Sequence, residues 1–183
     1  MYTNLVAKIK ELMMKASEGS LKILTQQGNL KKFLVDKGFV SAGTSDLRSQ
    51  PNAAPKYIIK IDKDFIYLAD YVIGQTFQNL RVNPRISLST IDMKTLEGWQ
   101  INGSTKIITK GVEYKRLLKA MIKQEARHTA KRIIEDVNGT QKYDFYQVLF
   151  PEKAVFIRVK CEKVTKINIA GKLQIEVVEK SYR

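Results

Sequence analysis

Apolar residues along this chain change from helical to strand-like spacing near residue 39. Before that point, intervals of three and four residues predict a helix over 4–16 and a second helix over 28–37 that ends at Gly38. Beyond it, short runs rich in β-branched and aromatic residues predict strands over 39–44, 56–61, 65–69, 85–91, 99–109, 154–161 and 173–178. The strand over 154–161 is expected to continue toward Ile169. Polar stretches at 45–52 and 62–64 predict turns between the first three strands.

Two further helices are expected between the strands. A short one is predicted over 75–82. The clearest helix of the chain covers 112–136, where an apolar stripe that includes Leu117 and Met121 runs beside many lysines and arginines, and Asn138 and Gly139 end it. Gly103, inside the strand over 99–109, predicts a bulge or bend.

This order of elements predicts a single, mainly β domain over 1–183. Many short strands, with helices at the start and inserted late, favour a small β-barrel with helical additions. The regular strand–helix alternation of a doubly wound parallel sheet is missing. We expect a helical N-terminal extension over 1–37, barrel strands within 38–110 and 154–169, and a helical insertion over 112–150.

Composition limits the classes of protein that the chain can belong to. It has 183 residues, of which 44% are hydrophobic, and this mixture is typical of a globular domain. The single cysteine, Cys161, excludes an intrachain disulfide and a cysteine-based zinc site. Charge interrupts the N-terminus too early for a signal peptide, and no apolar run is long enough to span a bilayer. We therefore expect a cytoplasmic protein without a membrane partner.

The net charge of +14 is unevenly distributed. Residues 105–134 hold nine basic and two acidic side chains, so half of the excess lies in thirty residues. Residues 34–104, which hold most of the strands, carry only +1. The charge therefore belongs to the helices, and it suggests a nucleic acid, an anionic substrate or a solvated surface.

Candidate catalytic side chains are few. His128 is the only histidine and lies in the basic helix, where a surface or packing role is expected. Motifs of hydrolases, P-loop proteins and Rossmann folds are absent. Gln75 and Thr76 follow Gly74 at the start of a predicted helix, where free N–H groups attract an anion such as phosphate. From spacing alone, a simple capped helix is the better explanation of these residues.

Five stretches in order carry a resemblance to a known family: 39–44 (FVSAGT), 51–57 (PNAAPKY), 65–70 (FIYLAD), 74–88 (GQTFQNLRVNPRISL) and 99–104 (WQINGS). Together they resemble the pyridoxamine 5'-phosphate oxidase-like, FMN-binding split-barrel family. The resemblance covers about residues 30–110, with a looser match over 154–169. It implies a six-stranded antiparallel split barrel that forms a homodimer with FMN at the subunit interface.

The resemblance also implies which residues bind the cofactor. The strand that lies along the flavin ring corresponds to Pro55, Lys56, Tyr57 and Ile58, and Asp70 falls near the ribityl chain. Gln75 and Thr76 match the phosphate-binding pair, with Asn79 one turn further on. Trp99 and Gln100 match positions beside the flavin, where an aromatic ring can stack.

The chain departs from the family pattern in two places. Relatives often carry Lys or Arg at the position of Gln75, so Lys56 or a residue of the partner subunit would have to compensate. The substrate-binding Arg and His of the vitamin-forming oxidase are not found within 160–183, so that particular enzyme is not expected. The prediction is an FMN-dependent oxidoreductase that acts on an unidentified small molecule.

Three alternatives remain open from the sequence. A flavin-binding or flavin-storage protein without turnover fits the same residues, and another flavin or a deazaflavin can replace FMN. Heme occurs in related barrels, but the lone His128 argues against it. A basic nucleic-acid-binding module rests on the helix over 112–136, in which Lys119, Lys123 and Arg127 are the candidate contacts.

Overall fold

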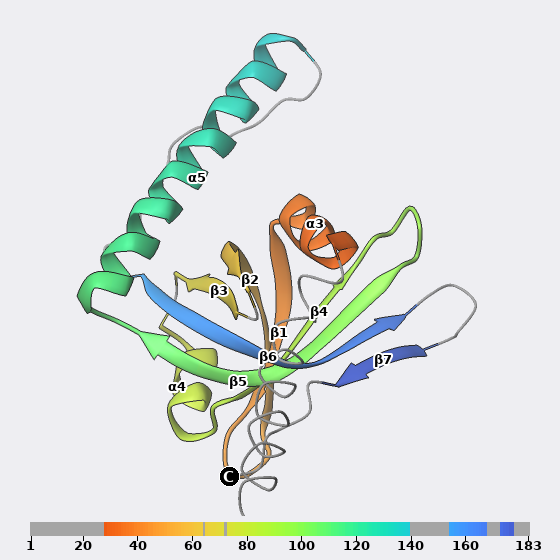
Figure 1. The fold of residues 1–183 in the computed structure, drawn as a ribbon. Coiled ribbons are helices and arrows are strands. Elements are labelled where there is room, and N and C mark those ends of the chain that lie inside the picture. The colour runs from red at the N-terminus through yellow and green to blue at the C-terminus, as the bar shows by residue number, and fades with distance from the viewer. Residues whose placement is uncertain (1–27, 64, 72, 140–153, 168–172, 178–183) are drawn as a thin grey trace, which may run out of the picture.

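The computed structural model describes residues 28–63, 65–71, 73–139, 154–167 and 173–177 (Figure 1). Within these ranges the chain forms three helices and seven strands, which are, in chain order, α3 (Gly28–Lys37), β1 (Phe39–Ser45), β2 (Pro51–Asp62), β3 (Phe65–Asp70), α4 (Gln75–Val82), β4 (Arg85–Ile91), β5 (Gly98–Ile108), α5 (Gly111–Val137), β6 (Val155–Ile167) and β7 (Leu173–Val177). None of the helices so described is long and apolar enough to cross a bilayer.

Six of the strands close into an antiparallel barrel. Their order in the sheet is β3-β2-β1-β4-β5-β6, and a pairing of β3 with β6 joins the two ends. The seventh strand, β7, extends the sheet beyond β6 and lies outside the closed ring. The predicted mainly β fold with a six-stranded antiparallel barrel is therefore confirmed.

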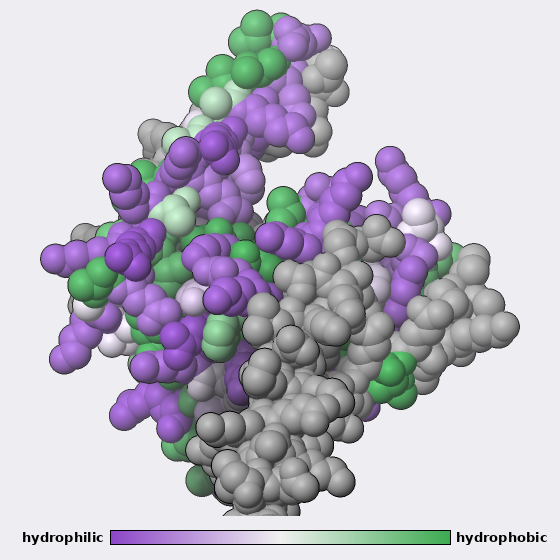
Figure 2. Space-filling model, in the orientation of Figure 1, coloured by the Kyte–Doolittle hydropathy of each residue, from purple (hydrophilic) through white to green (hydrophobic). Residues whose placement is uncertain are grey.

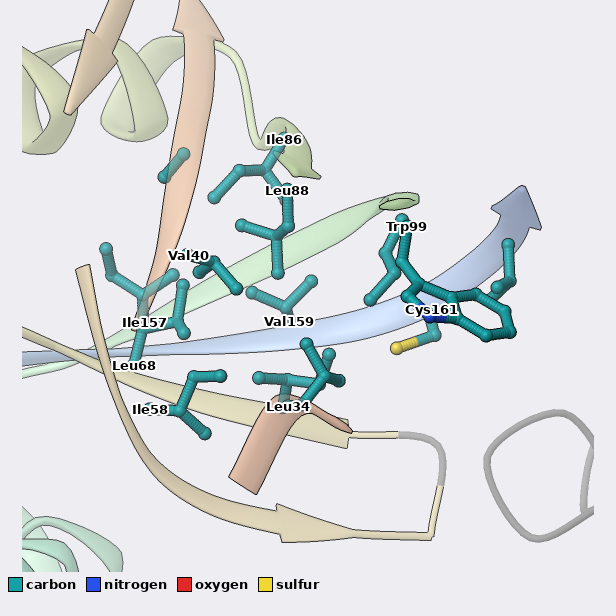
Figure 3. Close-up of a cluster of buried hydrophobic side chains, with 14 of the residues drawn as sticks. Leu34, Val40, Ile58, Leu68, Ile86, Leu88, Trp99, Ile157, Val159 and Cys161 are labelled. Atoms are coloured by element: carbon teal, nitrogen blue, oxygen red, sulfur yellow. The ribbon is translucent and has the colours of Figure 1, made fainter. Parts of the chain in front are cut away.

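Alternation along the strands fills the barrel interior. In β1, Val40, Ala42 and Thr44 are buried, whereas Phe39 and Ser41, which alternate with them, are exposed. The buried side chains meet in one core cluster, in which Leu30 and Leu34 of α3 also pack (Figure 3). Helix α3 thus contributes to the core through the apolar face that its sequence predicted.

A second, smaller core lies between the barrel and α5. Leu117 and Met121 of α5 pack with Ala69, Ile108 and Phe156, which belong to three different strands. The remainder of the helix runs outward beyond the barrel (Figure 1). Only the first half of α5 therefore depends on the barrel for its burial.

The bend predicted at Gly103 is present. The register between β5 and β6 shifts between Asn102 and Gly103, and the backbone of β6 approaches closely there. A Cβ atom at Gly103 would lie 2.0 Å from the carbonyl oxygen of Lys160. Glycine is required because only a residue without a side chain permits this approach.

One predicted boundary is wrong. Strand β2 begins at Pro51 rather than at residue 56, and the turn after β1 is correspondingly shorter than 45–52. Residues 51–55 lack β-branched side chains, but they pair with β1, from Ser45 opposite Pro51 to Ser41 opposite Pro55. Tertiary pairing overrides local propensity here. The helix predicted over 4–16 lies outside the described residues, as does the insertion beyond residue 139.

Candidate functional site

Buried polar side chains gather around the first turn of α4. Asn52 of β2 donates hydrogen bonds to the hydroxyl oxygens of Thr76, at 3.0 Å, and of Thr44, at 3.4 Å. Asn79 also donates to Thr44, at 3.2 Å. Thr76 is 3% exposed and Asn79 is 1% exposed, so this cluster, which we call the α4 cluster, fixes the helix against β1 and β2 from beneath.

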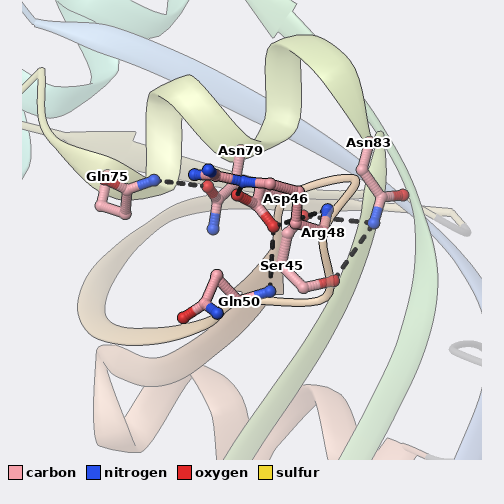
Figure 4. A network of polar contacts seen from close by, with 7 residues as sticks. All are labelled: Ser45, Asp46, Arg48, Gln50, Gln75, Asn79 and Asn83. Atoms are coloured by element: carbon pink, nitrogen blue, oxygen red, sulfur yellow. Dashed lines mark hydrogen bonds and ion pairs between the residues drawn. The ribbon is translucent and has the colours of Figure 1, made fainter.

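Gln75 extends the α4 cluster to the surface. Its side-chain amide donates to Oδ1 of Asn79 at 2.7 Å, and the side chain itself is exposed (Figure 4). At the other end of α4, Asn83 donates to the backbone oxygen and the hydroxyl oxygen of Ser45, both at 3.2 Å. Gly74, the residue before the helix, offers no side-chain cap, so α4 leaves its first N–H groups available for an anion.

The strand predicted to lie along a flavin divides its side chains between two faces. Lys56 and Ile58 are buried, whereas Pro55 and Tyr57 are exposed. Asn52 lies on the same face of β2 as Lys56, four residues away, because side chains two and four apart share a face of a strand. The α4 cluster and Lys56 are therefore neighbours along β2.

Lys56 forms a buried ion pair with Asp70. Its Nζ lies 2.9 Å from Oδ1 of Asp70, and the two side chains are 8% and 2% exposed. These two residues, fourteen positions apart, are brought together because Asp70 ends β3, the neighbour of β2. The Asp70 carboxylate already pairs with the positive charge of Lys56. This lysine is therefore not a free cation that could take the place of the Lys or Arg expected at position 75.

Tyr71, which the sequence did not single out, links the barrel to α5. Its hydroxyl donates to Oε1 of Glu125 at 3.0 Å, and its ring centroid lies 5.4 Å from that of Tyr57. Burial, together with the nearby carboxylate of Glu125, raises the pKa of the Tyr71 hydroxyl well above its usual range. Tyr71 is therefore a neutral hydrogen-bond donor throughout the physiological range of pH.

Trp99 and Gln100 point in opposite directions from β5. The Trp99 side chain is 5% exposed and packs in the barrel core near Cys161 (Figure 3). Gln100 is exposed, and its amide donates to the hydroxyl oxygen of Ser87 at 3.3 Å. The structure does not bring these two side chains into the α4 cluster, and the packing of Trp99 leaves little of its ring available to a ligand. A flavin contact at either residue stays a prediction.

A hollow of about 410 Å³ lies between β2 and α5. Residues of β2, including Ile58 and Ile61, line one wall, and Lys123, Arg127 and His128 line the helical side. The amide of Gln124 donates to the backbone oxygen of Ile58 at 3.0 Å and ties α5 to the strand there. The hollow therefore borders the strand that was predicted to lie along the cofactor.

The remaining candidate groups have structural roles or stay at the surface. Cys161 is a buried thiol in the core, as predicted, and His128 is exposed on α5. Among the residues that the structure describes, no three His, Cys, Asp or Glu side chains gather in a way that could hold a metal ion.

Sequence reasoning missed Thr44, Asn52, Tyr71 and Glu125. Asn52 lies inside the PNAAPKY stretch that carried the family resemblance, so a signal for it was present. Tyr71 and Glu125 are 54 residues apart, and no local pattern connects them.

Comparisons with known proteins agree with this architecture. A family model described as pyridoxamine 5'-phosphate oxidase matches residues 27–150. A comparison with curated protein sequences finds no significant match.

Solved structures with a similar fold include three with different descriptions. A protein of Clostridium acetobutylicum related to general stress protein 26 is 15% identical, with 80% of this chain and 91% of that chain covered and a TM-score of 0.57. A pyridoxamine 5'-phosphate oxidase-related, FMN-binding protein of Nostoc punctiforme is 10% identical, with coverage of 86% and 99% and a TM-score of 0.53. HutZ, the heme storage protein of Vibrio cholerae, is 14% identical, with coverage of 74% and 89% and a TM-score of 0.51.

These structural likenesses concern the fold, and their descriptions span both flavin and heme. The family model, in contrast, matches well over half of the chain and includes β1 to β5 together with α4. With the closed six-stranded barrel, it shows that the chain belongs to the pyridoxamine 5'-phosphate oxidase-like split-barrel family.

Proposed function

We propose that this protein binds FMN at the amino end of α4 and along β2, and that it acts as a flavin-dependent oxidoreductase on a small molecule. The observation that carries the proposal is the α4 cluster, which fixes an uncapped helix N-terminus beside β2. FMN, when bound, supplies the electron-transfer chemistry that side chains lack. The residues of the chain then need only bind, orient and shield it.

The donors at α4 fit a phosphate group without a cation. Backbone N–H groups of the first turn and the exposed amide of Gln75 are neutral donors of the kind that bind phosphate at helix N-termini. Thr76 and Asn79 are buried beneath them, so these two side chains position the turn, and the Thr76 hydroxyl still has a proton to donate. Affinity for the phosphate is expected to be lower than with Lys or Arg at position 75.

A row of exposed apolar side chains supports a homodimer. Phe39 of β1 lies opposite Tyr57 of β2, and Gly98 of β5 lies opposite both Ile91 of β4 and Ile167 of β6. Phe39, Tyr57, Ile91 and Ile167 are all exposed on the outer face of the barrel. A second copy of the chain seated on this row would remove it from water and place two cofactor sites at the interface.

The hollow between β2 and α5 favours turnover over storage. It borders Ile58 on the strand assigned to the cofactor, and it offers room for a small molecule beside that strand. The alternative is a flavin-binding protein without turnover, which requires the same cofactor residues but no second ligand.

The absorbance spectrum of the purified full chain tests the cofactor. Flavin bands are expected in the purified protein, or in colourless protein that has been mixed with FMN and then separated from unbound FMN. A Soret band in place of flavin bands would assign heme instead, and protein that binds neither would remove both assignments. Bleaching of bound flavin by a nicotinamide donor under anaerobic conditions, followed by reoxidation in turnover, separates an oxidoreductase from a storage protein.

Two substitutions at α4 test the phosphate site. Gln75→Lys adds the cation that relatives carry, so it should tighten FMN binding by about 1.5–3 kcal/mol, the range for a hydrogen bond to a charged group, without tightening riboflavin. Thr76→Ala should weaken FMN by a similar amount, whereas Thr76→Ser should retain most of the affinity. Equal effects on FMN and riboflavin would move the phosphate away from α4.

A further inference from the structure

One face of α5 carries an uninterrupted set of basic side chains. Lys115, Lys119, Lys123 and Arg127 follow one another at four-residue intervals, and Arg116 lies next to the first of them. Residues three and four apart share a side of a helix, so these five form one face, which we call the basic face of α5. All five are exposed.

Acidic residues of α5 do not neutralise the basic face. Glu113 pairs with Arg158 of β6 at 3.2 Å, and Glu125 accepts the hydrogen bond from Tyr71. Glu135 lies 3.6 Å from Lys131, beyond the end of the basic face. None of the five basic side chains makes an ion pair with another residue in the described ranges.

The basic face is exposed because α5 packs on the barrel core mainly through another side, although Lys123 and Arg127 also border the hollow toward β2. Leu117 and Met121 are the buried residues of α5, and they lie among the strands of the second core. Figure 2 shows hydrophilic surface along much of the projecting helix, with hydrophobic residues gathered toward its far end. A large partner can therefore approach the helix without displacing any part of the barrel.

We infer that the basic face of α5 binds the phosphate backbone of a nucleic acid. From Lys115 to Arg127 the helix rises about 18 Å, and a DNA duplex presents about ten phosphate charges over that length. Lysine and arginine side chains spaced along a helix make such contacts without reading the base sequence. The concentration of half of the net charge in residues 105–134, which include this face, then has a physical role.

An anionic membrane is the less favoured partner. Helices that lie on bilayers carry one broad apolar face beside their charges. In α5 three exposed large apolar residues, Ile133, Ile134 and Val137, lie at the far end, and of the large apolar residues only Val112 and Ile122 are exposed in the turns that carry the basic face. Most of the exposed apolar surface is therefore separated from the charge along the helix, and it does not form one broad apolar face beside the charges.

The test variant leaves the hollow intact. Lys123 and Arg127 also line that hollow, so the substitutions are placed at Lys115, Arg116 and Lys119, which do not line it. The matched control reverses three exposed lysines outside α5, namely Lys94, Lys106 and Lys160. Both triple changes to Glu alter the net charge equally. A difference in nucleic-acid affinity between the two variants therefore depends on where the charges lie and not on their number. Circular dichroism and flavin content verify that each variant is folded.

The assay is fluorescence anisotropy of the full-length protein with a labelled 20-base-pair DNA duplex and a single-stranded RNA of the same length, from 50 to 300 mM KCl. Wild type should bind at least one of them, with an affinity that falls steeply with salt. The triple α5 variant should bind at least tenfold more weakly at the lowest salt. The plot of log K against log salt should be less steep by about 3, since each lost phosphate contact reduces the magnitude of the slope by about 0.9.

Three results would overturn the inference. The first is no binding of either nucleic acid by wild type at 50 mM KCl. The second is an equal loss of binding in the control variant, which would assign the effect to net charge. The third is binding to vesicles that contain phosphatidylglycerol without binding to either nucleic acid, which would make an anionic bilayer the partner.

Discussion

The buried pair of Lys56 and Asp70 offers the sharpest test of the barrel near the candidate site. The two side chains are 8% and 2% exposed, and their charged atoms lie 2.9 Å apart. Removing one partner of such a pair leaves an uncompensated buried charge, at a cost of about 3–5 kcal/mol. We therefore expect Lys56→Met and Asp70→Asn each to lower the free energy of unfolding by that amount, a large fraction of the roughly 5–15 kcal/mol of a typical domain.

The double variant isolates the interaction from the other consequences of each change. Because Lys56→Met and Asp70→Asn together leave neither charge buried, the double variant should be less destabilised than the sum of the single variants. Urea unfolding followed by circular dichroism and by tryptophan fluorescence measures all three. Lys60, also on β2 and paired with Asp62 at 2.6 Å, provides the matched control, because both side chains of that pair are about half exposed.

Surface pairs contribute little, so Lys60→Met should leave the urea midpoint nearly unchanged. The reasoning fails if Lys56→Met costs no more than Lys60→Met, or if the two single effects at Lys56 and Asp70 simply add. The same proteins also test the cofactor assignment. Since Asp70 engages the charge of Lys56, Lys56→Met should not change the preference for FMN over riboflavin.

Three further predictions concern the rest of the barrel. Gly103→Ala should cost about 1–3 kcal/mol, as overpacking does, and Gly98→Ala should cost less, since a Cβ at Gly98 meets its nearest neighbour at 3.5 Å; equal costs would contradict the bulge geometry. Trp99, the only tryptophan, is 5% exposed, so its fluorescence should resist acrylamide in the folded protein, and ready quenching would contradict its place in the core. The pKa of Asp92 is lowered to about 2, mainly by the hydrogen bond from Lys37, whereas the unfolded value is about 3.9. The ionised Asp92 carboxylate therefore stabilises the fold above pH 4, and this contribution is lost as the pH falls through 2. The unfolding midpoints of wild type and Asp92→Asn should accordingly differ at pH 5 and converge near pH 2, and an unchanged difference would remove this pair from the acid response.

Local patterns predicted the helices and most strands of the described chain. The helices over 28–37 and 75–82 match α3 and α4, and the helix over 112–136 differs from α5 by one residue at each end. Apolar periodicity and terminal glycines are properties of neighbouring residues, so the sequence displays them directly. The start of β2 was missed because only its pairing with β1 makes Pro51 part of a strand.

The candidate site was predicted less completely. Thr76 and Asn79 were identified from the family resemblance, and the structure brings them together with Asn52 and Thr44, whose roles were not foreseen. Those contacts join residues 24 and 35 positions apart, and only the packing of α4 against β1 and β2 creates them. The burial of Trp99 was likewise invisible, because an aromatic residue in an alternating strand can face either side until the register is known.

The position of β6 in the chain has a consequence for synthesis. This strand fills the gap between β3 and β5, yet it is made after α5, as residues 155–167. Until it leaves the ribosome, two strand edges stay unpaired while the five earlier strands are already outside, and unpaired edges invite association with other chains. We expect nascent chains stalled before residue 155 to aggregate or to require a chaperone, and release of residues 155–167 to end that requirement.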